Sequence, residues 1–158
     1  MNNPASKQEP DLLIYLKEKY INLDLKGDTK KEIVEELVGL IFGLGKQKDK
    51  KALINEILKR EKLGSTGIGN GVAIPHAKSD KMKNFILAFA RKREGIDYGA
   101  LDGEKTYLFF LLASPESNVG GHLKILSGIS RLVKDKFIVD RLKKAADKKE
   151  IIKIFSVF

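Results

Sequence analysis

Two histidines supply all the imidazole chemistry available to this chain. His76 ends the segment GSTGIGNGVAIPH, directly after Pro75, and His122 follows 46 positions later. A free imidazole has a pKa of about 6.5, so it can act at cellular pH as a nucleophile, a proton donor or acceptor, or a metal ligand. Any such reaction in this protein must use His76, His122 or both.

The glycines before His76 predict how it is presented. Four glycines lie between residues 64 and 71, together with Ser65 and Thr66, and such a run predicts a loop because glycine loses the most backbone freedom on ordering. The apolar residues 72–74 predict a short buried strand that ends at Pro75, which has no amide for a ladder. His76 is then held at the mouth of the loop. The pattern alone is equally compatible with a loop histidine that has no chemical role.

Several other chemistries lack their motifs. The chain has no cysteine, which excludes disulfides, thiolate catalysis and cysteine-bound zinc. The glycine segment has neither the G-K-[ST] end of a P-loop nor a placed G-x-G-x-x-G, and no G-x-S-x-G elbow is present. Zinc sites need three or four ligands, and no third ligand accompanies the two histidines at local spacing. We therefore expect no metal and no cofactor.

The elements before the glycine segment must position it. We predict a helix at Asp11–Tyr20 and an exposed strand at Ile21–Leu25 from their apolar spacing. Thr29 and Glu32 form a T-x-x-E capping box, which predicts that a helix begins there. A second amphipathic helix after residue 49 delivers Arg60 at its C-terminal end, where the unpaired carbonyls favour a cation.

The second half of the chain predicts the sheet. Asn84–Arg91 and Thr106–Ala113 are nearly continuous apolar runs of strand length, and a turn at residues 102–103 separates them. From His122 the apolar spacing is helical again, so His122 should begin a helix and point inward; two more helices are expected at residues 137–145 and 151–155. The predicted fold is α/β: a single-domain sandwich with a mixed β-sheet flanked by helices on both faces, spanning residues 11–158 after a mobile N-terminal tail at 1–10.

The net charge of +9 is concentrated near the C-terminus. Residues 123–158 hold 10 basic and 4 acidic side chains, mostly on the polar faces of predicted helices. Such lysines are usually a solvated surface, and no aromatic platform or recognition motif accompanies them, so no nucleic-acid partner is expected. No apolar run is long enough for a membrane span, and nothing at the N-terminus reads as a signal peptide. We expect an intracellular, cytoplasmic protein without membrane insertion.

Taken together, several motifs resemble one family. The run GSTGIGNGVAIPHA, the preceding Arg60-Glu61 pair, the turn EGIDYGALDG and the late H-L-K at His122 closely resemble the enzyme IIA (EIIA) type 2 domains of the fructose, mannitol and nitrogen-regulatory family. These domains are phosphocarriers of the bacterial sugar phosphotransferase system. The family often has an acidic residue just before its second histidine, whereas this chain has Gly121 there. The sequence therefore gives no support to a role for a carboxylate at this position.

The resemblance implies roles for three residues. His76 corresponds to the histidine that accepts the phosphoryl group, and His122 and Arg60 correspond to residues that line the same site. The implied function is a phosphotransferase component, accepting phosphoryl from an HPr-type phosphocarrier and passing it to the cysteine of an enzyme IIB domain. The alternative is a nitrogen-regulatory EIIA that controls target proteins through its phosphorylation state. Because the HPr surface docks on mainly apolar surroundings, we expect the basic charge of residues 123–158 to lie away from His76.

Overall fold

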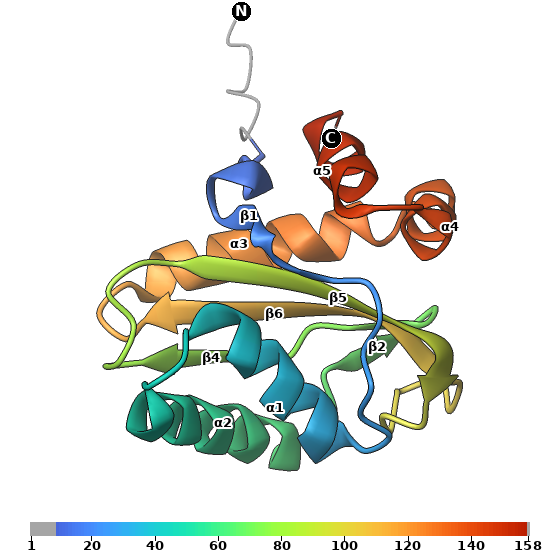
Figure 1. The fold of residues 1–158 in the computed structure, drawn as a ribbon. Helices are drawn as coiled ribbons and strands as arrows, with labels where there is room; N and C mark the ends of the chain where they lie inside the picture. The colour runs from blue at the N-terminus through green and yellow to red at the C-terminus, as the bar shows by residue number, and fades with distance from the viewer. Residues whose placement is uncertain (1–8, 158) are drawn as a thin grey trace, which may run out of the picture.

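The computed structural model describes residues 9–157, which form one mixed β-sheet with helices on both faces (Figure 1). Helices α1 and α2 cover one face, and α3, α4 and α5 cover the other (Figure 1). The elements in chain order are a 3-10 helix η1 (Leu12–Ile14), β1 (Leu16–Asn22), α1 (Lys30–Ile41), α2 (Gln47–Lys62), β2 (Gly67–Gly69), β3 (Val72–Ala73), β4 (His76–Ser79), β5 (Ile86–Ile96), β6 (Thr106–Pro115), α3 (Val119–Leu132), α4 (Lys136–Lys144) and α5 (Lys148–Ser156).

The long strands β5 and β6 form the centre of the sheet. They pair antiparallel, with Phe89 opposite Phe110. β1 adds in parallel to β5, whereas β3 and β4 add in parallel to the other edge of β6, and β2 pairs antiparallel with β3. The predicted central strands and the mixed sheet are therefore confirmed, although β5 continues five residues beyond Arg91 to Ile96.

Burial on both faces explains the unbroken apolar runs. Alternate residues of β5 and β6 enter opposite cores: Leu87 and Phe110 pack under α3, α4 and α5, while Ala88 and Phe109 pack against α1 and α2. A strand covered on one side would alternate apolar and polar residues instead. Helices on both faces of one sheet confirm the predicted α/β sandwich.

The helix predicted at Asp11–Tyr20 is wrong. A short 3-10 helix ends at Ile14, and β1 occupies Leu16–Asn22, so the strand predicted at Ile21–Leu25 also begins earlier and ends sooner. The apolar residues of this segment repeat at helix-like spacing, but Leu16 and Ile21 pair with the exposed edge of β5. Backbone pairing with that edge decides the conformation, which local spacing does not reveal.

The glycine segment is more ordered than the predicted loop. β2 and β3 form a small hairpin whose two turn residues, Asn70 and Gly71, have φ of 56° and 79°. Two-residue hairpin turns of this kind need a positive φ at both positions, and Asn-Gly is the dipeptide that adopts it most readily. The Asn70-Gly71 pair was therefore the sequence signal for a hairpin that the loop prediction overlooked. The strand predicted at residues 72–74 ends at Ala73, one residue sooner than expected, and pairing with β6 resumes at His76 in β4.

The helix starts agree with the predicted caps. The Thr29 hydroxyl accepts a hydrogen bond from the Glu32 amide at 3.2 Å, which confirms Thr29 as the N-cap of α1. The Glu32 carboxylate reaches the amide of Asp28 instead of that of Thr29. α3 begins at Val119, three residues before the predicted start, because Asn118 caps it by accepting from the Gly121 amide. His122 consequently lies within the first turn of α3.

Most of the predicted N-terminal tail, residues 1–8, lies outside the described residues, so its mobility stays a prediction. Glu9, the first described residue, forms an ion pair with Arg131 of α3. Among residues 9–157, no helix combines the length and apolar character needed to cross a membrane.

Candidate functional site

Three elements meet at the β4 edge of the sheet, around a cavity of about 440 Å³. β4 contributes His76, the last turn of α2 contributes Arg60, and the first turn of α3 contributes His122. The structure thus brings the three predicted site residues to one cavity, although 62 positions separate Arg60 from His122. The other lining residues are Glu56, Lys59, Leu63, Ala77, Lys78, Leu123 and Leu126.

A backbone contact fixes the tautomer of His76. Its Nδ1 lies 2.7 Å from the carbonyl oxygen of Ile74. A carbonyl can only accept, so Nδ1 carries the proton and donates it, and Nε2 keeps its lone pair. Burial lowers the pKa of His76 below its ordinary value, and the positive charge of Arg60 lowers it further, against the raising effect of the Ile74 contact. His76 is therefore a neutral imidazole at pH 7 with a nucleophilic Nε2.

The second imidazole, that of His122, contacts a hydroxyl group of the sheet. His122 is buried, and its Nδ1 lies 2.7 Å from the hydroxyl of Ser114 on β6. The centres of the two imidazole rings lie 5.4 Å apart, with their planes at 54°. Burial, followed by the charges of His76 and Lys78, lowers the pKa of His122 to about 4. Both rings are therefore neutral at cellular pH, so they do not repel each other.

Arg60 is positioned by the end of its own helix. Its Nη1 donates to the carbonyl oxygen of Gly64 at 2.8 Å, which satisfies a carbonyl just beyond α2. A guanidinium carries five N–H donors, so this bond leaves others for an anion in the cavity. The predicted placement of a cation at the end of this helix is confirmed.

Glu61 was missed as a residue that shapes the site. Its buried carboxylate accepts from the amide and hydroxyl of Thr66, from the hydroxyl of Tyr98 at 3.0 Å and from the ammonium of Lys30 at 3.0 Å. These bonds tie the end of α2 to the glycine segment and to the turn before β6. Burial and the charge of Glu61 raise the pKa of Tyr98 well above its ordinary value, so Tyr98 remains a donor.

Three more charged residues that line the cavity, Glu56, Lys59 and Lys78, were also missed. Lys78 lies two positions after His76 on β4, so both side chains share one face of the strand. This relationship becomes visible only once residues 76–79 are known to be a strand. Glu56 lies one helical turn before Arg60, and its Oε2 is buried without a hydrogen-bond partner among the described residues. The cavity is therefore lined by three basic side chains, Lys59, Arg60 and Lys78, beside the imidazoles, and by one carboxylate, that of Glu56.

The packing around Gly121 explains why no acidic residue precedes His122. A Cβ atom added to Gly121 would lie 2.5 Å from Cζ of Phe85, which is closer than any real contact. Any side chain at this position would require Phe85 to move. Here the aromatic ring occupies the space into which a carboxylate at residue 121 would extend.

The positive charge of residues 123–158 does not reach the cavity. Of the described residues in this segment, 123–157, only the apolar Leu123 and Leu126 line it. Two basic side chains of α4, Lys136 and Lys143, line a different cavity. This placement agrees with the expectation that the excess charge lies away from His76.

The fold and the site define a class of protein. An α/β sandwich that holds a neutral imidazole with a free Nε2, a second imidazole and a guanidinium in one open cavity is equipped to carry a phosphoryl group, because such a transfer needs mainly a nucleophile and charge stabilisation. The comparisons with known proteins agree. Residues 14–157 match the family described as phosphoenolpyruvate-dependent sugar phosphotransferase system, EIIA 2. The chain belongs to this family, whose members are phosphotransfer components.

Relatives of two kinds resemble the chain. It is 38% identical over 136 residues to the fructose-specific EIIABC component of Bacillus subtilis, covering 86% of this chain but only 21% of that protein. It is also 38% identical over 133 residues to the nitrogen regulatory protein of Bradyrhizobium diazoefficiens, covering 84% of this chain and 86% of that protein. The phosphoryl-carrier role is common to the family, and the relatives include both sugar-system and nitrogen-regulatory proteins.

Solved structures show the same fold. The nitrogen regulatory protein IIA-Ntr of Neisseria meningitidis superposes with a TM-score of 0.82 at 33% identity, covering 90% of this chain and 97% of that one. The mannitol IIA of Escherichia coli superposes with a TM-score of 0.73 at 20% identity, covering 88% and 97%, which supports the fold alone.

Proposed function

We propose that Nε2 of His76 accepts a phosphoryl group from an HPr-type phosphocarrier and passes it to the cysteine of an enzyme IIB domain, in the cytoplasm. The observation that carries this proposal is the contact between Nδ1 of His76 and the Ile74 carbonyl, because it leaves Nε2 unprotonated. The new phosphorus–nitrogen bond forms at Nε2 while the bond to the donor breaks. No general base is needed, since the attacking atom carries no proton.

The neighbouring residues would stabilise the charge on the transferred group. Arg60 offers N–H donors to the phosphoryl oxygens, and Lys78 adds a second positive charge from the same face of β4. If the Ser114 hydroxyl donates to Nδ1 of His122, Nε2 of His122 carries the proton and can donate to a phosphoryl oxygen.

Donor and acceptor would use one docking surface. Exposed leucines flank the cavity: Leu63 is 83% exposed and Leu123 is 60% exposed. A carrier must bind and release its partners quickly, and such short-lived protein contacts bury little area. We therefore expect HPr and a IIB domain to compete for this surface, and simultaneous binding without mutual effect would contradict the shared surface.

A phosphorylation assay tests the proposal directly. The chain is incubated with labelled phosphoenolpyruvate, enzyme I and HPr, and the modified residue is mapped at alkaline pH, where phosphohistidine is stable. Label on His76 that moves to the cysteine of an added IIB domain is the expected result. Label on His122 with full incorporation in a His76→Ala variant would overturn the assignment of the acceptor.

The nitrogen-regulatory role is the second candidate. It is favoured by a relative of that name whose length this chain covers almost completely and by the IIA-Ntr structure with a TM-score of 0.82. In this case His76 would still be phosphorylated, but its phosphorylation state would control binding to a target protein. Label that enters His76 and moves to none of a panel of IIB domains would favour regulation over transport.

A further inference from the structure

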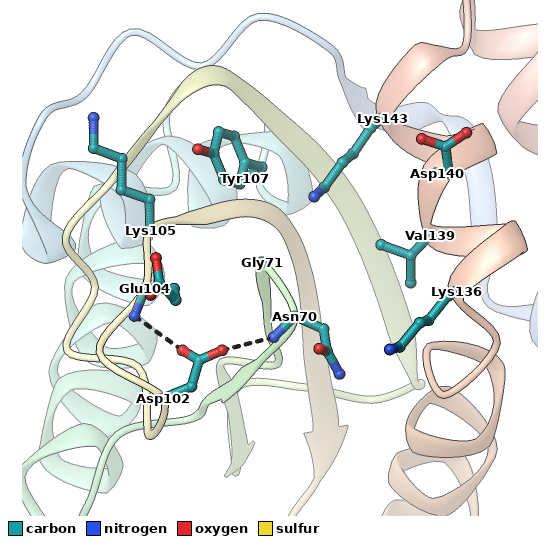
Figure 2. Close-up of a pocket in the computed structure, with 10 residues that line it drawn as sticks. All are labelled: Asn70, Gly71, Asp102, Glu104, Lys105, Tyr107, Lys136, Val139, Asp140 and Lys143. Carbon is teal, nitrogen blue, oxygen red and sulfur yellow. Dashed lines mark hydrogen bonds between the residues drawn. The ribbon is translucent and has the colours of Figure 1, made fainter.

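A second cavity lies apart from the imidazoles and has a volume of about 610 Å³ (Figure 2). Its walls are the β2–β3 turn at Asn70, the segment 102–105, Tyr107 at the start of β6, and α4. None of its lining residues lines the His76 cavity. Its volume falls in the range of roughly 300 to 1,000 Å³ that is typical of small-molecule sites.

Three lysines line this cavity, and each lacks an ion-pair partner among the described residues. Lys136 and Lys143 extend from α4, and their ammonium groups point toward the hollow, while Lys105 comes from the segment before β6 (Figure 2). No carboxylate of the described residues lies within 4.0 Å of any of the three ammonium nitrogens.

The carboxylates that line the same cavity are mostly engaged elsewhere. Asp102 accepts from the amides of Asn70 and Glu104, both at 3.0 Å (Figure 2). Asp140 pairs with Lys144 at 3.1 Å. Asp102 and Asp140 thus have local partners, whereas none of the three lysines has a carboxylate partner among the described residues, so their ammonium groups are available to an anionic group.

The rest of the cavity wall can bind the hydroxyl groups of a molecule that also carries an anionic group. The half-buried ring of Tyr107 lines the cavity, and the ammonium of Lys143 lies over it at 4.8 Å from the ring centre, so a group bound to Lys143 would lie beside the ring. The side-chain amide of Asn70 and the carboxylate of Glu104 can bond to hydroxyl groups, and the Glu104 carboxylate has no hydrogen bond among the described residues. An aromatic face with polar groups at its rim is a common arrangement for polyols, and the lysines would hold a phosphate.

From these contacts we infer that the cavity binds a small phosphate monoester of a sugar or polyol, separately from phosphoryl transfer at His76. Lys136 and Lys143 of α4 do not line the His76 cavity, so phosphoryl transfer alone assigns them no role. Binding should be saturable but modest in affinity, because the cavity is open and Lys136 and Lys143 are exposed. The inferred binding of a phosphate monoester does not depend on the proposed function, since His76 lies outside this cavity.

An NMR titration of the whole chain with glucose 6-phosphate tests the inference, with glucose and inorganic phosphate as separate probes. We expect saturable shifts at the amides of Asn70, Gly71 and Val139, with glucose 6-phosphate binding more tightly than either part alone. Lys136→Gln and Lys143→Gln should each weaken binding about tenfold, the effect of losing one charged hydrogen bond. His76→Ala should bind like the unchanged protein.

Lys148 provides a matched control. Like Lys136, it is the first residue of a nine-residue helix that an aspartate caps, but it does not line the cavity. Lys148→Gln should leave binding unchanged. Shifts that rise without saturation, or that Lys148→Gln reduces as much as Lys143→Gln does, would reject a site and indicate general attraction of anions. Equal affinity for glucose and glucose 6-phosphate would reject the phosphate as the recognised group.

Discussion

Nδ1 of His76 lies 2.7 Å from the carbonyl oxygen of Ile74, on the other side of Pro75 in the same interrupted strand. Because Pro75 cannot donate a ladder hydrogen bond, the strand pauses between β3 and β4, and the Ile74 carbonyl is available to the imidazole. One local interruption of the strand therefore sets the tautomer of the proposed phosphoryl acceptor.

The two histidines should differ in what their removal costs. His76→Ala should abolish phosphoryl acceptance, because no nucleophile remains at that position. His122→Ala should still accept phosphoryl but transfer it onward roughly 10²- to 10³-fold more slowly, as expected for the loss of a charge-stabilising donor. Rapid-quench measurement of both half-reactions checks this. Equal loss of acceptance in both variants would contradict separate roles.

Arg60→Lys should reduce the rate of acceptance by roughly tenfold or more. The ammonium of lysine keeps the charge but lacks the planar fork that binds two phosphoryl oxygens, and it cannot hold the Gly64 carbonyl in the same way. The rate of label incorporation from phosphorylated HPr measures the effect. Lys62→Gln is the control, since Lys62 lies in the same helical turn but does not line the cavity.

Lys78→Gln should shorten the lifetime of phosphorylated His76 or slow its formation by a few-fold, because one positive charge near the phosphoryl group is lost. Lys81→Gln removes a positive charge nearby in sequence but outside the cavity and should have little effect. Measured rates of formation and hydrolysis of the phosphohistidine distinguish the two variants. If the two variants show the same rates, the charge of Lys78 does not stabilise the phosphoryl group on His76.

Stability should fall as the pH drops through the histidine range. His122 has a pKa of about 4 in the folded protein and about 6.5 when unfolded, so the unfolded chain binds the proton more readily. The contribution of His122 to the free energy of unfolding is complete above a pH of about 6.5 and is lost progressively as the pH falls to about 4. His76 acts in the same direction.

Urea unfolding of the unchanged protein and of His122→Gln between these pH values measures this contribution. The variant should show a weaker dependence of the unfolding free energy on pH from about 6.5 to 5, above the range in which carboxylates titrate. Parallel curves for the two proteins would mean that His122 is not held neutral by the fold.

Glu61→Ala should destabilise the protein by roughly 3 kcal/mol, because it removes a buried carboxylate and leaves its donors unpaired. Tyr98→Phe deletes one of these hydrogen bonds and should cost roughly 1 kcal/mol. Chemical unfolding curves give both values. If Glu61→Ala unfolds with an unchanged midpoint, the carboxylate does not secure the end of α2 to the glycine segment.

The sequence by itself determined the elements whose patterns are local. The unbroken apolar runs predicted β5 and β6, the Thr29 cap predicted the start of α1, and the helix before the glycine segment predicted where Arg60 would lie. Caps, long apolar runs and helical periodicity depend on neighbours within a few residues, so they can be read without the fold. The family motif around His76 and His122 added the candidate site.

Only the tertiary structure decided which segments pair and which polar groups meet. β1 is a strand because the edge of β5 accepts it, and β4 exists because β6 extends beyond Ala113 to receive it. The Ser114 contact to His122, the place of Lys78 beside the imidazoles and the donors around Glu61 depend on residues far apart in the chain. Such contacts follow from strand pairing and packing, which local sequence patterns do not specify.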